Sequence, residues 1–366
     1  MIIKRYIICM IGNILSMRSC PVSPEFHRIV FKVDRIGDFF LSLGALHALL
    51  DNDSGKTALV VSHDVHKLAC IEFPNVSVVP IYYRTGRFSE ILRMFLTSRL
   101  LGLTGSELVC LRHQRINFHN LAMRAIRSQS SYGYKISQPS VSSSFVPYVF
   151  TYLSTKSTTV SAGLCHEIMR HKHVLELLGI PPPLLPFCDY LGKINMTSRI
   201  IIAPLGGNSI RDIPATLLDF IVRSIRRNSS MPIAICCAPM QLSRLEKLVI
   251  DAKVQCSINA DLSIDTYINW IASASLVVSA DSASAHMAAT FDRPLVGLIA
   301  GGHDCEFVPW KHSNRQHWLT KRVDCFNCDW KCIYPTPICL HDINKKQIDE
   351  AIFKALANDQ PEESVC

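Results

Sequence analysis

Residues 28–50 of the chain read RIVFKVDRIGDFFLSLGALHALL. The opening run, 28–33, is short, apolar and rich in β-branched residues, as expected for a strand buried in a parallel sheet. A loop at 34–38 leads into 39–50, where apolar residues recur at helical spacing. The alternation continues with a strand at 57–62, a helix at 64–72 and a strand at 76–80. This order predicts a parallel sheet with helices on both faces.

A second alternation follows residues 181–183, three consecutive prolines that are typical of a stiff linker between domains. Its expected strands are 199–203, 232–236, 276–280 and 295–299, and its expected helices are 214–226, 242–251, 264–273 and 282–291. The fold class is therefore α/β, with two doubly wound Rossmann-like domains facing a cleft where ligands bind at the carboxyl ends of the strands. The expected parts are an N-terminal extension at 1–26, domains at 27–180 and 181–343, and a C-terminal helix and tail at 344–366.

The chain has 366 residues, of which 48% are hydrophobic, and a net charge of +8, which fits two globular domains and excludes a disordered chain. Between residues 81 and 127 the charged residues are Arg84, Arg87, Arg93, Arg99, Arg112, Arg115, Arg124 and Arg127, against Glu90 and Glu107. Guanidinium groups suit phosphates and carboxylates, so this stretch favours an anionic acceptor or an anionic membrane surface. A solvated basic face without a ligand is the alternative. No nucleic-acid-binding motif accompanies the arginines, so we expect no nucleic-acid partner.

Fifteen cysteines are present, most of them single residues in apolar runs, where a thiol behaves as a small buried hydrophobic group. This usage predicts a reducing, cytoplasmic compartment. Near the N-terminus an apolar run at 6–14 is interrupted by Gly12 and Asn13, and it is shorter than the roughly 20 apolar residues that span a bilayer. We expect a surface-lying or disordered extension there, with Met17 as an alternative start, and no transmembrane segment later in the chain.

Gly37 and Asp38 end the loop between the first strand and its helix. Gly37 allows the backbone to approach a ligand closely. A carboxylate at the carboxyl end of a strand can accept a proton from an attacking hydroxyl, which makes Asp38 a candidate general base. The alternative is that Asp38 only caps the helix.

The loop 203–211 contains Gly206, Gly207, Asn208 and Arg211, and it precedes the helix that Pro214 opens. Paired glycines expose amides and a helix N-terminus favours anions, so a phosphate can bind here with Arg211 across it. The Gly-Lys-Ser/Thr ending of a Walker loop is missing. A glycine pair without a ligand is the alternative.

Asp281, Ser282 and His286 directly follow the expected strand 276–280. Backbone amides point outward at such a turn, which can hold both a sugar hydroxyl and a diphosphate. Helix capping by the aspartate or the serine, beside an incidental histidine, is the alternative.

Four cysteines, Cys325, Cys328, Cys332 and Cys339, lie within fifteen residues of one another. Four thiols can build a tetrahedral structural site for zinc or iron. The second pair is not a clean Cys-x-x-Cys, and reduced or partly paired thiols are the alternative. We place no catalytic chemistry in this segment.

In their order along the chain, these motifs resemble glycosyltransferase family 9, the heptosyltransferase family of bacterial glycosyltransferases. The resemblance spans about residues 28 to 355. It rests on Gly37-Asp38, Pro204-Leu205-Gly206 with Arg211-Asp212-Ile213-Pro214, the run DSASAH at 281–286, Pro309-Trp310, and a cysteine segment ending in Cys339-Leu340-His341-Asp342-Ile343.

The resemblance implies a GT-B fold and an inverting transfer without a metal at the reaction centre and without a cofactor. The implied donor is a nucleotide-diphosphate sugar, with ADP-heptose favoured, bound by the domain at 181–343. The implied acceptor is a lipopolysaccharide-core or related glycan, bound by the domain at 27–180 on the cytoplasmic face of the inner membrane.

The roles of the family's residues carry over position by position. Asp38 looks like the general base, Arg211 takes the place of the lysine that holds the donor phosphates, and Asp281 looks like the ligand of the donor sugar's hydroxyls. The remaining expected donor-binding residues are Gly206, Gly207, Asn208, Gln241, Ser282, Ala283 and His286, and the expected acceptor-binding residues are Arg35, Arg84, Arg87, Arg112 and Arg115.

Five positions depart from the family's pattern. Two of the changes are conservative, Ser282 for threonine and Arg211 for lysine. Ala283 stands where the family has glycine, Ile213 where it has tryptophan, and Gln241 in the region of its ribose-binding acid. These departures leave the donor base open. They also keep two alternatives, an inactive module that binds a nucleotide sugar or glycolipid, and a GT-B nucleotide-sugar epimerase.

Overall fold

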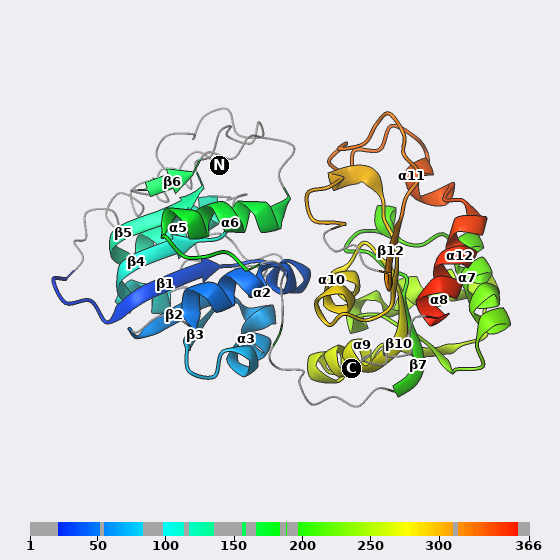
Figure 1. Cartoon of the computed structure of the whole chain (residues 1–366), viewed down its shortest axis with the longest axis horizontal. Coiled ribbons are helices and arrows are strands. Elements are labelled where there is room, and N and C mark those ends of the chain that lie inside the picture. The colour runs from blue at the N-terminus through cyan, green and yellow to red at the C-terminus, as the bar shows by residue number, and fades with distance from the viewer. Residues whose placement is uncertain are drawn as a thin grey trace, which may run out of the picture. The chain divides into compact units, whose positions relative to one another are not determined.

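The computed structural model describes residues 21–51, 55–82, 98–112, 117–134, 156–158, 166–183, 188, 197–309 and 314–357. The chain divides into two compact units, Met1–Pro186 and Phe187–Cys366, and each contains a parallel sheet of six described strands (Figure 1). The four-part division expected from the sequence, with its central boundary at 180–181, stays a prediction. Residues 1–20 of the expected extension lie outside the described ranges.

The sheet of the N-terminal unit has the strand order β3-β2-β1-β4-β5-β6, and every neighbouring pair is parallel. Val30 in β1 pairs with Leu59 in β2 on one side and with Val109 in β4 on the other. The chain fills one side of β1 before it crosses to the other, so the strand order reverses between β1 and β4. Ligands bind at such switch points in open α/β sheets. The strands are β1 (Phe26–Lys32), β2 (Thr57–Ser62), β3 (Ser77–Ile81), β4 (Thr104–Cys110), β5 (Arg127–Tyr134) and β6 (Lys156–Thr158).

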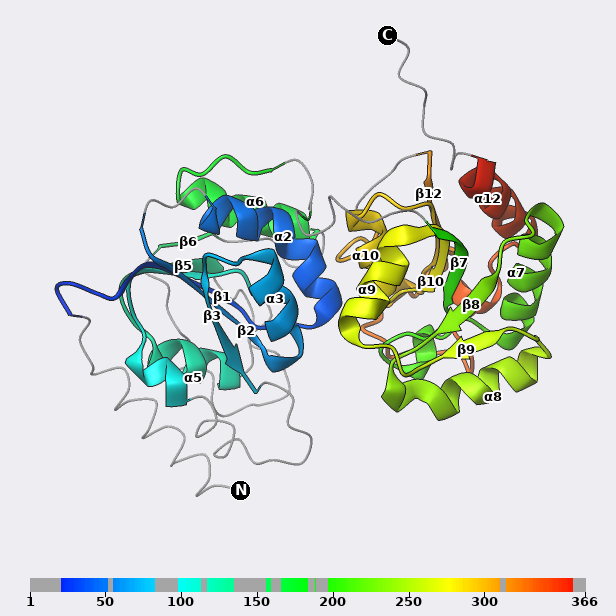
Figure 2. The ribbon, with the colours of Figure 1, turned by 90° about the horizontal axis from the view of Figure 1, so that it is seen from below.

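Helices cover both faces of this sheet, and Figure 2 shows α2 and α6 on one face and α5 on the other. α2 (Ile36–Leu50) is apolar around nearly its whole circumference, and twelve of its fifteen residues are buried. A helix that is apolar all round must be covered on all sides, and α6 (Glu167–Leu177) packs beside it. The other described helices of this unit are η1 (His63–Val65), α3 (His66–Glu72), η2 (Ser98–Gly102) and α5 (Asn117–Ala125).

The sheet of the C-terminal unit repeats this plan, with the strand order β12-β11-β10-β7-β8-β9 and parallel pairing throughout. Its switch point lies between β7 and β10. The strands are β7 (Thr197–Ala203), β8 (Ile233–Cys236), β9 (Ser257–Asn259), β10 (Ala274–Ala280), β11 (Leu295–Leu298) and β12 (Gln316–Leu319). The helices are η3 (Ser209–Arg211), α7 (Ala215–Asn228), η4 (Pro239–Gln241), α8 (Leu242–Ala252), α9 (Ile264–Ser273), α10 (Ala283–Thr290), η5 (Gly301–His303), α11 (Ile338–His341) and α12 (Lys345–Ala357). α9 and α10 cover one face, and α7 and α12 cover the other (Figure 2).

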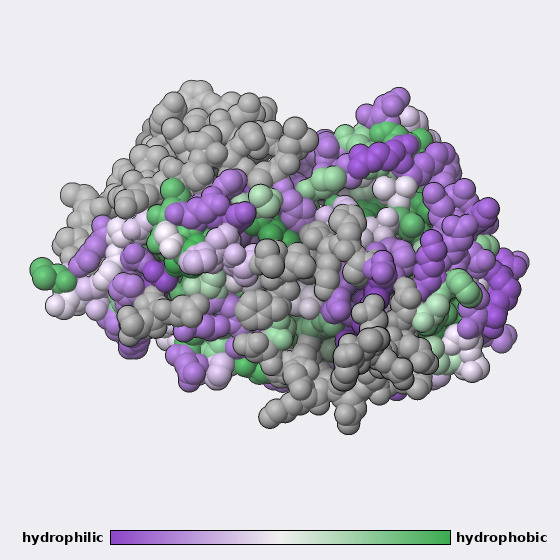
Figure 3. Space-filling model, viewed as in Figure 1, coloured by the Kyte–Doolittle hydropathy of each residue, from purple (hydrophilic) through white to green (hydrophobic). Residues whose placement is uncertain are grey.

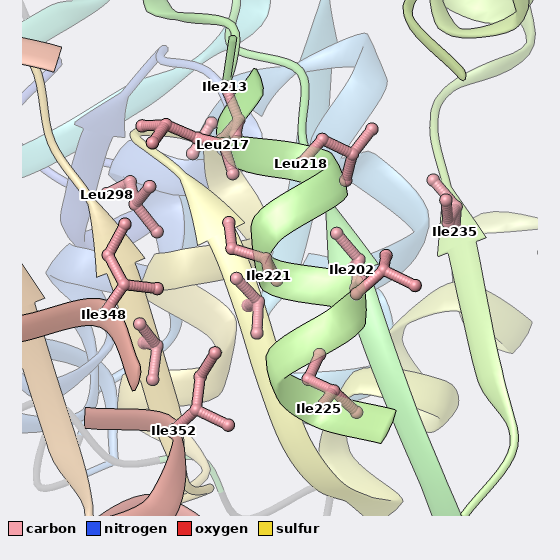
Figure 4. Packing of buried hydrophobic residues seen from close by; sticks show 14 of the residues in the cluster. Ile202, Ile213, Leu217, Leu218, Ile221, Ile225, Ile235, Leu298, Ile348 and Ile352 are labelled. Carbon is pink, nitrogen blue, oxygen red and sulfur yellow. The ribbon is translucent and has the colours of Figure 1, made fainter. Parts of the chain in front are cut away.

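The core of the C-terminal unit forms where α7 packs on the sheet (Figure 4). Leu217, Ile221 and Ile225 of α7 recur at helical spacing and are buried. Ile348 and Ile352 of α12 belong to the same cluster. Burying one such side chain contributes about 1.5–3 kcal/mol, so the cluster fixes the strands whose ends carry the functional loops.

The outer surfaces of α7 and α12 are largely hydrophilic, as Figure 3 shows. Arg227 of α7 pairs with Asp349 of α12 at 2.7 Å, and both side chains are about half exposed. Exposed ion pairs contribute no more than about 1 kcal/mol, so the apolar faces hold these helices in place.

Eleven cysteines fall within the described ranges, and all of them are free thiols. No helix in the described part of the chain is both long enough and apolar enough to cross a bilayer.

Candidate functional site

Asp38 lies in the first turn of α2, directly after the loop that leaves β1 at the switch point of the N-terminal sheet. The N-cap residue of this helix is Arg35, and it makes no side-chain cap bond. Asp38 therefore does not occupy the capping position that the sequence left open. Its carboxylate is half-buried and lies at the edge where open α/β sheets bind ligands. Its role as a general base stays a prediction.

A cluster of buried charges lies next to this turn. The Nζ atom of Lys32, which is fully buried, lies 2.9 Å from Oδ2 of Asp34 and 3.4 Å from Oε1 of Glu167. His171 Nε2 lies 3.3 Å from the same oxygen of Glu167. Burial lowers the pKa of Lys32, and the negative charges of Glu167 and Asp38 oppose that shift. Buried ions carry a large desolvation cost, so their presence beside Asp38 marks this edge as a functional candidate.

Arg112 belongs to the same cluster. Its Nη1 donates a hydrogen bond to the carbonyl oxygen of Val33 at 3.0 Å and forms an ion pair with Asp34. Burial lowers the pKa of Arg112 to about 10. Through these two contacts Arg112 holds the loop after β1 in place.

Of the other four arginines expected to bind the acceptor, the structure describes only Arg35. Arg35 is exposed beside Asp38, at the start of α2. Arg84, Arg87 and Arg115 lie outside the described residues. The acceptor role of all five arginines stays a prediction.

The loop after β7 is closed by its own Asp212 and by side chains of η4 and α8. The amide of Gly206 donates to Oδ1 of Asp212 at 2.9 Å, and the Gly206 carbonyl accepts from Gln241 Nε2 at 3.1 Å and from Arg244 at 2.7 Å. A Cβ on Gly206 would lie 2.4 Å from the Cβ of Arg211, so only glycine allows this fold of the loop. Burial raises the pKa of Asp212, while its bond to the Gly206 amide and the nearby Arg244 lower it.

This closure separates the expected donor-binding residues into two groups. Gly206 and Gln241 are hydrogen-bonded to each other, and the Gln241 oxygen also accepts from the Ala238 amide at 3.3 Å. Gly207 and Asn208 are exposed at its tip. The binding of a donor by the tip of this loop and by Arg211 stays a prediction.

Arg211 connects this loop to the loop after β10. Its Nη1 lies 3.4 Å from Oδ2 of Asp281, and its Nε donates to Oδ1 of Asn208 at 3.3 Å. Its guanidinium carbon also lies 4.9 Å from the ring centroid of Trp330. The side chains of Arg211 and Asp281 are only 15% and 10% exposed, which strengthens their attraction relative to a surface pair. Three residues predicted from two separate motifs thus meet at the switch point.

The remaining residues of the third motif belong to the start of α10. Ser282 is the N-cap, and its hydroxyl accepts from the amide of Ser284 at 3.3 Å. Ala283 begins the helix, and His286 is buried within it. The capping role left open by the sequence is therefore present at Ser282. The contacts of these three residues with a diphosphate stay predictions.

The four cysteines of the C-terminal segment line one small cavity together with Phe326 and Trp330. All four carry free thiols. Within the described residues, which include all four, no group of three or more histidine, cysteine or acidic side chains is arranged to hold a metal ion. The structural zinc or iron site and its alternative, reduced or partly paired thiols, both stay predictions. Burial raises the pKa of Cys339, although the Gly301 amide that donates to its sulfur at 3.5 Å lowers it.

Residues 222–333 match the family model of glycosyltransferase family 9 (heptosyltransferase). The C-terminal unit carries a glycosyltransferase family 9 domain. The resemblance stated from the motifs is therefore confirmed. A sequence comparison with curated proteins finds no match.

Solved structures of similar fold include heptosyltransferases and a family 9 glycosyltransferase. A family 9 glycosyltransferase from Veillonella parvula has 13% identity and a TM-score of 0.69, over 93% of this chain and 99% of its own. The E. coli ADP-heptose lipopolysaccharide heptosyltransferase II has 14% identity and a TM-score of 0.67, over 92% and 100%. The E. coli heptosyltransferase WaaC, solved with ADP-2-deoxy-2-fluoro heptose, has 16% identity and a TM-score of 0.60, over 80% and 92%. The predicted GT-B fold, with two Rossmann-like domains, is confirmed.

Three features of the described sites follow no motif in the sequence. Lys32 and Glu167 come from distant positions that only the fold brings together. Arg244 lies on the exposed helix α8, where an arginine is unremarkable in sequence. Trp330 stands inside the cysteine segment, and the proline-tryptophan signature drew attention to Trp310 instead, which lies outside the described residues.

Proposed function

We propose that this chain is an inverting glycosyltransferase that moves heptose from a nucleotide-diphosphate sugar, with ADP-heptose favoured, to a lipopolysaccharide-core or related glycan. The meeting of Asn208, Arg211 and Asp281 at one switch point carries this proposal. A cation and a carboxylate at one edge suit a donor that has both an anionic diphosphate and a hydroxyl-rich sugar.

In the proposed reaction Asp38 accepts the proton of the acceptor hydroxyl, whose oxygen attacks the anomeric carbon of the donor sugar. The new carbon–oxygen bond forms as the bond to the diphosphate breaks, and the diphosphate leaves with the bonding electron pair. Arg211 stabilises the negative charge that develops on the leaving group. Before the attack, Asp281 accepts hydrogen bonds from the sugar hydroxyls and orients the ring.

The acceptor's chemistry also suggests a location. A lipopolysaccharide precursor is anchored in the inner membrane, so we place the enzyme in the cytoplasm and peripherally on that membrane's inner face. The arginine-rich stretch 81–127 and the net charge of +8 support attraction to anionic lipids and acceptors. Co-sedimentation with vesicles of phosphatidylglycerol, compared with vesicles of phosphatidylcholine, measures this attraction.

The central test is a donor and acceptor assay with a matched pair of variants. ADP-, GDP- and UDP-sugars are ranked by the rise in melting temperature that each produces, since a ligand specific for the native state stabilises it. Asp38→Asn should lower the transfer rate by roughly 10²- to 10⁴-fold and leave donor binding unchanged. Asp64→Asn, at an exposed position in η1, should leave both unchanged.

Other outcomes contradict the proposal. Full transfer by Asp38→Asn would remove the assigned base. Donor binding without turnover across a panel of acceptors would favour the inactive binding module. Release of an isomerised sugar in the absence of acceptor would favour the epimerase.

A further inference from the structure

Trp330 adopts a backbone conformation that a bulky residue rarely takes. Its φ is +61°, in the left-handed region, where Asn327 and Asp329 of the same segment also lie at +64° and +49°. Asparagine and aspartate tolerate this region, whereas a large aromatic residue is an outlier there. Such conformations persist only where the surrounding contacts determine them, and they concentrate at functional sites.

Contacts with the loop after β11 hold Trp330 in this conformation. The amides of Asn327 and Asp329 donate to the carbonyl oxygens of Gly301 and Gly302 at 2.8 and 3.1 Å. A Cβ on Gly302 would lie 2.3 Å from the indole ring, so the ring packs closely against a residue that has no side chain. The fold thus specifies the position of the indole closely.

The indole held in this way faces Arg211. The guanidinium carbon lies 4.9 Å from the ring centroid, while Nη1 and Nε point to Asp281 and Asn208. An aromatic face attracts a guanidinium through its quadrupole and leaves the N–H edges free for hydrogen bonding. Trp330 therefore contacts the face of the guanidinium, whereas an anion binds at its N–H edges.

We propose that Trp330 is a positioning residue for the donor diphosphate, which it serves by holding the guanidinium of Arg211 in its binding orientation. This inference rests on the proposed function, because it takes Arg211 as the ligand of the donor phosphates. When a diphosphate draws Arg211 away from Asp281, the indole still holds the long side chain in place. Less rotamer freedom is then lost on binding, which raises affinity.

A role confined to core packing does not account for these features. Trp330 is only half-buried, and a packing residue has no need of a strained backbone beside a cation. A platform for the nucleotide base is the remaining competing role, and it makes a different prediction. A base platform would bind adenosine as well as ADP, whereas a residue that acts through Arg211 matters only when phosphates are present.

The test compares ADP with adenosine by calorimetry, on variants of the whole chain. Trp330→Leu should weaken ADP binding by roughly 2- to 30-fold, the loss expected from a cation–π contact. Trp330→Phe should retain part of the affinity because it keeps an aromatic face. Adenosine binding should be the same in wild type and both variants. Tyr334→Leu, in the same segment and beside the same cavity, is the matched control and should bind ADP as wild type does.

A double variant separates this inference from the proposed function. In an Arg211→Ala background, Trp330→Leu should cause no further loss of ADP affinity, because the residue has nothing left to position. If Arg211→Ala binds ADP as wild type does, the proposed donor site itself fails. If Arg211→Ala weakens binding but Trp330→Leu does not, only the role of Trp330 fails. Equal losses for ADP and adenosine in Trp330→Leu would overturn positioning in favour of a base platform, and unchanged melting temperatures show that the variants are folded.

Discussion

Nη1 of Arg211 lies 3.4 Å from Oδ2 of Asp281, although 70 positions separate the two residues in the chain. They meet because their loops follow β7 and β10, which are neighbours in the sheet. In this arrangement each charge neutralises the other. An anionic ligand that binds Arg211 must compete with Asp281, and its arrival frees the carboxylate to accept hydrogen bonds.

This competition predicts the behaviour of Asp281→Asn. The amide removes the competing charge, so the affinity for ADP, which lacks the transferred sugar, should rise by roughly 2- to 5-fold, the size of a modest ion pair. The transfer rate should fall at the same time, because the neutral side chain holds the sugar hydroxyls less strongly. Calorimetry with ADP and a transfer assay measure the two effects. An unchanged or weaker ADP affinity would show that the ion pair does not oppose donor binding.

The pairing of Arg211 with Asp281 also shows what the sequence can and cannot reveal. Each residue was a candidate from its own motif, since a polar residue after a buried strand points to the ligand-binding edge. Buried strands were equally clear, as at 57–62, which the structure shows as β2 (Thr57–Ser62). The expected helix at 64–72 is in fact divided into η1 and α3.

Sequence patterns do not predict contacts that depend on the order of the strands or on close packing between distant loops. Lys32 contacts Glu167 across 135 positions, and no periodicity links them. The conformation of Trp330 follows from the missing side chain of Gly302, which lies on another loop. From the sequence alone, neither a single lysine in an apolar strand nor a tryptophan among cysteines indicates a functional role. Their partners are known only from the fold.

The buried lysine leads to a prediction about stability. Lys32→Met removes the cation and leaves the carboxylates of Asp34 and Glu167 without it, which should lower the free energy of unfolding by about 3–5 kcal/mol. Lys56→Met is the control, because Lys56 is 60% exposed in its pair with Glu25, and its loss should amount to less than about 1 kcal/mol. Hydrogen exchange of the β1 amides reports the opening of this unit. Equal protection in the two variants would mean that the cluster contributes nothing to stability.

The closed loop after β7 predicts that adding one methyl group at Gly206 destabilises the protein. In Gly206→Ala the new Cβ would lie 2.4 Å from Arg211 Cβ and 3.2 Å from the carbonyl oxygen of Asn208. The loop must shift, which should cost about 1–3 kcal/mol in unfolding free energy and weaken ADP binding through the displaced Arg211. Gly102→Ala is the control, because its Cβ would meet nothing within 4 Å. Denaturant titration and calorimetry measure both effects, and a variant that binds ADP as tightly as wild type would show that the loop adapts.

The last prediction concerns pH and His47, which is buried in α2. Its Nε2 lies 2.8 Å from Oε1 of Glu72, its Nδ1 pairs with Asp51, and the ring of Phe73 packs 4.8 Å away, centroid to centroid. Burial on its own lowers the pKa of His47, but the hydrogen bonds and charges of Glu72 and Asp51 outweigh burial and raise it.

The raised pKa sets the sign of the effect. Above the unfolded pKa of about 6.5, the native state binds more protons than the unfolded state. The stabilisation by protonated His47 is therefore complete below that pH and is lost as the pH rises through the folded pKa, with a slope of at most about 1.4 kcal/mol per pH unit for one proton. His47→Gln removes the titrating group, so urea unfolding of this variant, followed from pH 6 to 9, should lack that slope. If wild type and His47→Gln lose stability in parallel over this range, the titration belongs to another group and the assignment to His47 is wrong.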